Sequence, residues 1–173
     1  MQHSARRKPR YSKTFVAVAA VASSLAASSA LAAPVPVPSF ATPRQIQTLA
    51  ASLKHPLYWL GPLPGFSYEL TVTPSGRVFI RYLPTGTQVG DQRASFKTVA
   101  TYPVANATAE LQGAAKRLKR PTQAVKRGLA FTGRPPTSVF LAFNGSPYQI
   151  EVYTPSAKLT HAAAFGGRLV AIK

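Results

Sequence analysis

The chain lacks cysteine, and this absence excludes a disulfide framework, a thiol nucleophile and a lipid-modified cysteine. Acidic residues are also scarce, since four Asp and Glu stand against 21 Lys and Arg, and there are three histidines among 173 residues. The sequence contains no zinc-protease, nucleophile-elbow, phosphate-loop or dinucleotide-binding motif. We therefore expect a protein that is not an enzyme and that uses no cofactor and no metal.

The few titratable residues leave one catalytic alternative. A small hydrolase would need His55 or His161 in a cleft beside an acid, or Glu69 and Glu151 as a carboxylate pair. Both glutamates alternate with apolar neighbours, which is typical of solvent-facing strand positions, and Glu69 has Arg81 as its expected cross-strand partner. These features favour a structural role for the acids.

The first 32 residues have the order of an export signal. Residues 1–13 carry five basic side chains and no acid, and an uncharged, alanine-rich run follows. Small residues at Ala30 and Ala32 predict signal-peptidase cleavage between Ala32 and Ala33. Two adjacent arginines leave the export route open between general secretion and the twin-arginine pathway. We expect a secreted or cell-envelope protein that contacts the membrane only if the signal stays uncleaved.

The segment after the signal predicts a linker and one domain. Residues 33–41 alternate proline with valine, which favours an extended, proline-rich spacer, and residues 42–173 have the length of a single domain. Sixteen Lys and Arg remain beyond the signal against the four acids, a net charge of +12. This excess favours an anionic partner or surface.

Local patterns predict an α+β domain. Thr42, Pro43 and Gln45 form a capping-box start for a helix that runs from about residue 43 to 54. A second helix is expected at 107–119, capped by Asn106, with four residues facing inward: Leu111, Ala114, Ala115 and Leu118.

The strand pattern is clearest between residues 66 and 83. Pro74 and Gly76 suit a three-residue hairpin loop, and that loop places Tyr68 opposite Tyr82. Further strands are expected at 95–102, 128–132, 138–143 and 148–153, and residues 168–172 are expected to close the sheet as an edge strand. Together these elements predict an antiparallel sheet of about six strands with two helices packed on one face.

Six basic residues form the densest charge of the mature chain: Lys116, Arg117, Lys119, Arg120, Lys126 and Arg127. A cationic cluster of this kind binds phosphate- or carboxylate-bearing polymers or lipid headgroups by counterion release. Few aromatic residues are interleaved with it, so it would bind nucleic acid only without sequence readout. Cations near a helix C-terminus also complement the helix dipole, so a solvated helix face is the competing interpretation.

Tyr58 and Trp59 suggest a second kind of site. They lie in a proline-bounded aromatic segment that would serve as a platform for a carbohydrate or a partner protein, or would simply pack over the core. The sequence thus favours an exported, non-catalytic domain that associates with anionic envelope material. A carbohydrate- or protein-binding module built on Tyr58 and Trp59 is the alternative.

Four stretches resemble a group of small exported proteins of unknown function that are typical of high-GC Gram-positive bacteria: His55 to Trp59, Tyr68 to Thr71, Gly76 to Pro84 and Arg134 to Val139. The resemblance extends over about residues 50–155 and includes no catalytic motif. It implies export and a single domain, and it implies no activity.

Overall fold

The computed structural model describes residues 35–172. The elements below all belong to one compact unit, Ala33–Lys173. The predicted signal at 1–32 and its cleavage point lie outside the described residues. The elements, in chain order, are β1 (Ser39–Ala41), α1 (Pro43–Leu53), β2 (Leu57–Trp59), β3 (Phe66–Val72), β4 (Val78–Pro84), β5 (Lys97–Pro103), α2 (Ala107–Arg117), β6 (Gln123–Val125), β7 (Gly128–Thr132), β8 (Ser138–Phe143), β9 (Tyr148–Tyr153), α3 (Ala157–Phe165) and β10 (Val170–Ile172).

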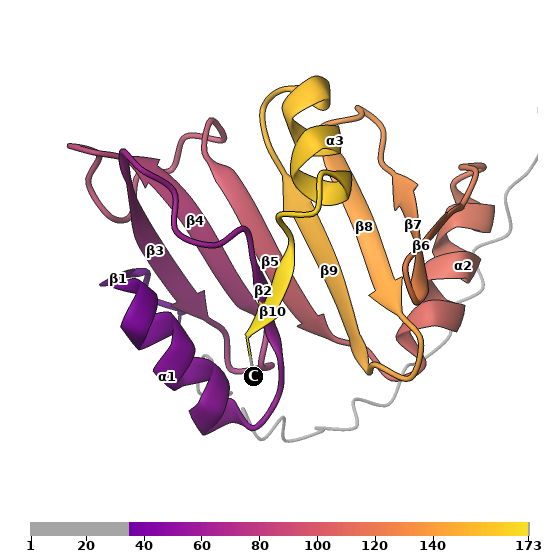
Figure 1. The fold of residues 1–173 in the computed structure, drawn as a ribbon, viewed down its shortest axis with the longest axis horizontal. Coiled ribbons are helices and arrows are strands. Elements are labelled where there is room, and N and C mark those ends of the chain that lie inside the picture. The colour runs from indigo at the N-terminus through magenta and orange to yellow at the C-terminus, as the bar shows by residue number, and fades with distance from the viewer. Residues whose placement is uncertain (1–34, 173) are drawn as a thin grey trace, which may run out of the picture. The chain divides into compact units, whose positions relative to one another are not determined.

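An antiparallel sheet of eight strands organises this unit, which confirms the α+β class (Figure 1). Its order is β1-β3-β4-β5-β9-β8-β7-β6, and every neighbouring pair is antiparallel. The expected number of about six strands was too low because β1 and β6, at the two edges, have three residues each. β1 pairs with β3 inside the predicted linker, so the ordered fold begins at Ser39 and not at Thr42.

The first helix and the first hairpin have the structure that the sequence predicts. Thr42 and Gln45 form a complete capping box, and Pro43 opens α1. Across the hairpin, Tyr68 faces Tyr82, and Gly76 takes the left-handed conformation with a φ of 75°. Both predictions are confirmed, because each depends only on hydrogen bonds between residues close in the sequence.

The last strand has a different partner from the one expected. β10 does not close the main sheet and instead pairs with β2 in a separate two-stranded ribbon, with Ala171 opposite Tyr58. Residues 57–59 are buried on both sides of their strand, and the backbone N–H of Tyr58 donates to the Thr101 hydroxyl of β5. The ribbon therefore lies over the sheet as part of a second layer.

The helices cover both faces of the sheet, so the expected packing of the helices on one face is wrong. α1, the β2–β10 ribbon and α3 pack against one face, where they enclose a core that includes Ile46, Ile80 and Ala163. Figure 1 shows α3 and β10 in front of the sheet. α2 packs on the opposite face through Leu111 against Phe131. Neighbouring residues of β7 and β8 belong to different cores because strand side chains alternate between faces.

Three details of the helices differ from expectation. α2 ends at Arg117, and Leu118, expected to face inward, is 62% exposed because it follows the last helical turn. Asn106 occupies the N-cap position in a left-handed conformation, but its side chain makes no capping hydrogen bond. α3 was not predicted; its buried Thr160 hydroxyl bonds Thr154 and the neighbouring backbone, a pattern that apolar periodicity does not reveal.

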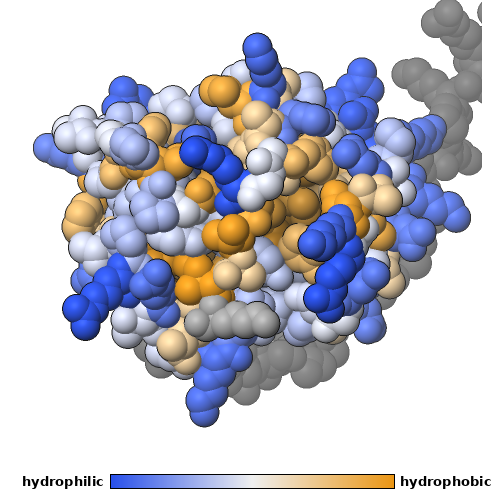
Figure 2. Space-filling model, in the orientation of Figure 1, coloured by the Kyte–Doolittle hydropathy of each residue, from blue (hydrophilic) through white to orange (hydrophobic). Residues whose placement is uncertain are grey.

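The face of the second layer is apolar at its middle and hydrophilic around it (Figure 2). Two apolar side chains are well exposed in this layer, Leu159 of α3 and Val170 of β10. Within residues 35–172, each helix is too short or too polar to cross a bilayer.

Candidate anion-binding surface

The cations that follow α2 are held by an ordered helix terminus. Lys119 takes a left-handed conformation with a φ of 52°, its N–H donates to the carbonyl of Lys116, and the N–H of Arg120 donates to the carbonyl of Ala115 at 2.8 Å. This is the double hydrogen-bond pattern of a Schellman motif. Lys116, Arg117 and Lys119 are exposed around it, so the motif fixes the backbone from which three cations project.

A fifth cation, which the sequence pattern did not include, lies near the same helix end. The Arg120 side chain donates from Nε to the carbonyl of Thr132 at 2.9 Å, which ties the helix end to the end of β7. Arg134 follows Thr132 by two residues and is exposed. We call the set Lys116, Arg117, Lys119, Arg120 and Arg134 the helix-end surface. Arg134 is included because the contact between Arg120 and Thr132 brings this part of the chain to the end of α2.

Lys126 and Arg127 do not belong to this surface. They form the two-residue turn between β6 and β7, where Val125 pairs with Gly128. Arg120 bonds to the opposite end of β7, and β7 spans five residues, or about 14 Å. The structure therefore splits the six predicted cations into a group of four and a group of two.

Three of the four acids lie on other elements, and Glu110 lies in the first turn of α2, at the opposite end of the helix from the cations. Glu69 pairs with Arg81, as expected, but the expected exposure is wrong because Glu69 is 1% exposed under the segment 85–96. Its second oxygen accepts the N–H of Gly90 at 2.6 Å. Asp91 binds Arg93, whose hydrogen bonds lower the pKa of Asp91 to about 2.

The remaining two acids make no ion pair within the described part of the chain. Glu151 accepts hydrogen bonds from the hydroxyls of Tyr102 and Ser138, each at 2.7 Å. Burial, and then the neighbouring Glu151, raises the pKa of Tyr102. β4 and β5 separate the strands of Glu69 and Glu151, a distance of about 14 Å, so the two carboxylates do not form a pair.

Basic residues occupy three of the four left-handed positions held by non-glycine residues between 35 and 172. These are Lys54 at the end of α1, Lys119 and Arg127, and the fourth is Asn106. A residue with a Cβ in this conformation costs about 1 kcal/mol relative to glycine, which is the usual residue there. The domain therefore carries lysine or arginine where glycine would be more stable.

Tyr58 and Trp59 are largely buried. Trp59 is 4% exposed and packs its ring edge-on against Tyr68, at 6.0 Å between centroids. Tyr58 is 8% exposed and stacks on Phe143 at 5.5 Å, and burial raises its pKa. Trp59 offers no open ring face to a ligand, whereas Tyr58 reaches the wall of a cavity beside Lys126 and Arg127.

The two histidines of the described residues contact aromatic rings. His55 stacks on Tyr148 at 4.8 Å, and His161 lies 4.7 Å from Phe165. Neither takes part in an ion pair within the described residues. In the same part of the chain no three His, Asp or Glu side chains come close enough together to hold a metal ion.

Comparison with protein-family models, curated proteins and solved structures finds no match for this chain.

Proposed function

We propose that the protein is an exported, non-catalytic domain that associates with anionic material of the cell envelope through the helix-end surface. The ligand chemistry is the phosphate or carboxylate group of a wall polymer or of a lipid headgroup. One observation carries the proposal: four cations of α2 and its C-terminus, joined by Arg134, project where no acid forms an ion pair with them among the described residues.

The conformation of Lys119 supports binding over a merely solvated helix face. Cations at a helix C-terminus are favoured by the dipole, but that benefit does not require the left-handed position, which favours glycine. A lysine there places charge beyond the last turn, next to the segment that Arg120 ties to β7. The hydrogen bonds of the helix end and the Arg120 contact thus hold the backbone from which these cations project.

A non-catalytic role is supported by the surroundings of the titratable groups. His55 and His161 lie against aromatic rings, Glu69 and Asp91 are engaged by arginines, and Glu151 is engaged by two hydroxyls. Catalysis needs a base or nucleophile directed at an open site, together with groups that stabilise charge there. The described residues offer structural partners for each of these side chains.

The test is a binding panel with salt titration. The domain from Ala33 to Lys173, which forms a compact unit, is titrated with a teichoic-type polymer, anionic vesicles, duplex DNA and a neutral glycan. The triple variant Lys116→Gln/Arg117→Gln/Lys119→Gln should weaken vesicle binding about 100-fold, because each surface cation contributes about 1 kcal/mol there. On duplex DNA the salt slope should fall by about 2 to 3.

A matched control removes the same number of charges elsewhere. The variant Arg44→Gln/Lys54→Gln/Lys158→Gln also loses three exposed cations, one of them in a left-handed helix terminus. It should retain most of the binding. Equal losses in the two variants would show that net charge alone acts, and salt-independent binding to the neutral glycan would favour the aromatic alternative.

A further inference from the structure

A second cationic site lies at the other end of the β6–β7 hairpin. A cavity of about 520 Å³ opens between the β6–β7 turn, the β8–β9 turn and the β2–β10 ribbon. Small-molecule sites commonly have volumes of about 300–1,000 Å³. We call it the turn cavity; its walls include Tyr58, Lys126, Arg127, Ser146, Pro147 and Tyr148.

The charged residues that line the turn cavity are all basic. Lys126 and Arg127 are exposed at its edge, and none of the four acids lines it. The carbonyl of Arg127 accepts the N–H of Asn144 at 2.8 Å, which joins the two turns and anchors the backbone that carries the cations. An anionic group therefore finds two donors on an anchored backbone.

The remaining walls are rigid rings. Tyr58 is braced by its stack on Phe143, and Tyr148 is braced by its stack on His55. Pro56 and Pro147 add two further rings to the lining. Rings that are already held in place lose little entropy on binding, and they complement the apolar C–H face of a sugar.

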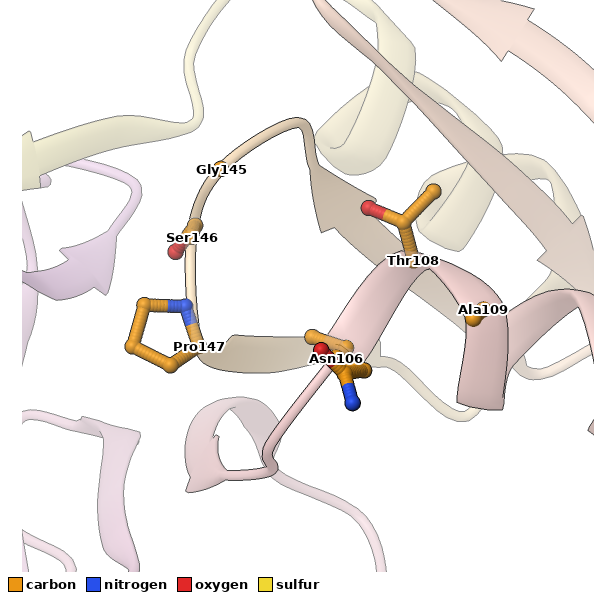
Figure 3. Close-up of a pocket in the computed structure, with 7 residues that line it drawn as sticks. Asn106, Thr108, Ala109, Gly145, Ser146 and Pro147 are labelled. Atoms are coloured by element: carbon orange, nitrogen blue, oxygen red, sulfur yellow. The ribbon is translucent and has the colours of Figure 1, made fainter.

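A pair of hydroxyls lies in the wall of the cavity. The Oγ of Ser146 is buried, and its interaction with the Tyr58 hydroxyl opposes, in part, the rise that burial causes in the pKa of Tyr58. Figure 3 shows the Ser146 side chain turned away from the helix that carries Thr108 and Ala109. Ser146 therefore holds the Tyr58 hydroxyl in the wall of the cavity, where it can pair with a ligand hydroxyl.

From this combination we propose that the turn cavity binds an acidic sugar unit of a glycan. The carboxylate or phosphate of the sugar lies on Lys126 and Arg127, its ring lies between the aromatic and proline walls, and a ring hydroxyl pairs with the Tyr58 hydroxyl. This site is separate from the helix-end surface, and it requires a ring as well as charge.

The test is a backbone amide NMR titration of the domain from Ala33 to Lys173. Four probes separate the contributions: a galacturonate trimer (ring and carboxylate), glucose 6-phosphate (ring and phosphate), maltotriose (ring alone) and tripolyphosphate (charge alone). One or both acidic sugars should shift the amides of 126–128, 144–146 and 148 to saturation. A comparison of the two sugars then tells carboxylate from phosphate. Maltotriose should leave these amides unmoved, and tripolyphosphate should shift those of 116–120 instead.

Variants then assign the contacts. Lys126→Gln/Arg127→Asn should weaken the acidic sugar at least tenfold, and Asn tolerates the left-handed conformation of position 127. Tyr58→Phe, which keeps the stack on Phe143, tests the hydroxyl and should cost a few-fold. The triple variant of the helix-end surface should bind the acidic sugar normally, so a failure of the envelope proposal and a failure of this one are distinguishable. The proposal is overturned if neither acidic sugar shifts the turn amides, or if tripolyphosphate shifts them equally well.

Discussion

Arg81 reaches beneath the segment 85–96 to meet Glu69, which lies directly opposite it in the β3–β4 ladder, with 2.5 Å between Nη1 and Oε1. The same guanidinium donates from Nη2 to the carbonyls of Asp91 and Arg93 and lies over the ring of Phe96. The pair therefore fastens a long connecting segment onto the sheet.

Removing one partner of this ion pair should strongly destabilise the fold. Glu69→Gln keeps the shape but leaves the Arg81 charge in a mostly buried place without its counter-ion, at a cost of about 3 kcal/mol in the free energy of unfolding. Urea denaturation measures that loss, and limited proteolysis should show faster cleavage within 85–96. The exposed control Arg44→Gln should change stability by about 0.5 kcal/mol or less. Equal effects of the two variants would contradict the fastening role.

Lys119→Gly should separate stability from binding. Glycine adopts the left-handed conformation freely, so the free energy of unfolding should rise by about 1 kcal/mol, while binding to anionic vesicles weakens by about fivefold. Thermal denaturation and vesicle sedimentation measure the two effects.

Lys54→Gly is the matched control, because Lys54 ends α1 in the same left-handed conformation. It should gain similar stability with unchanged vesicle binding. A loss of binding as large as that of Lys119→Gly would remove the special role of the helix-end surface.

Asp91 should titrate abnormally because of Arg93. Its pKa of about 2 lies below the ordinary value, so the native state gains stability from this group at pH values above about 4, and loses it as the pH falls through about 2. Arg93→Gln should return the pKa of Asp91 part of the way toward its ordinary value of about 3.9, because it removes the guanidinium hydrogen bonds and leaves the one from the backbone N–H of residue 93. A carboxyl-carbon NMR titration measures this, and an unchanged pKa in the variant would refute the assignment.

Trp59, the single tryptophan, should behave as a core residue. Trp59→Ala should lower the free energy of unfolding by about 4 kcal/mol, because it removes a large side chain packed against Tyr68. In the unmodified protein its fluorescence should resist iodide quenching and stay constant when a neutral glycan is added. Quenching as strong as in the unfolded chain, or a glycan-dependent shift, would restore the platform hypothesis.

Several elements could be predicted because they depend on neighbouring residues. The capping box at Thr42 and the turn at Gly76 fix α1 and the β3–β4 register through local hydrogen bonds, and that register places Arg81 opposite Glu69. The short strands β1, β2, β6 and β10 have three residues each and depend on distant partners, so local patterns miss or misplace them.

For the candidate sites too, some features could be predicted from the sequence and others depend on contacts between distant residues. The sequence alone determined the net positive charge, the scarcity of acids and the absence of thiol chemistry, because these follow from composition. Only the tertiary structure separated Lys126 and Arg127 from the cations at the end of α2, added Arg134 to that surface and placed Tyr58 in a cavity with basic side chains. The physical reason is that strand pairing and layer packing bring together residues far apart in the chain, and no local pattern encodes those contacts.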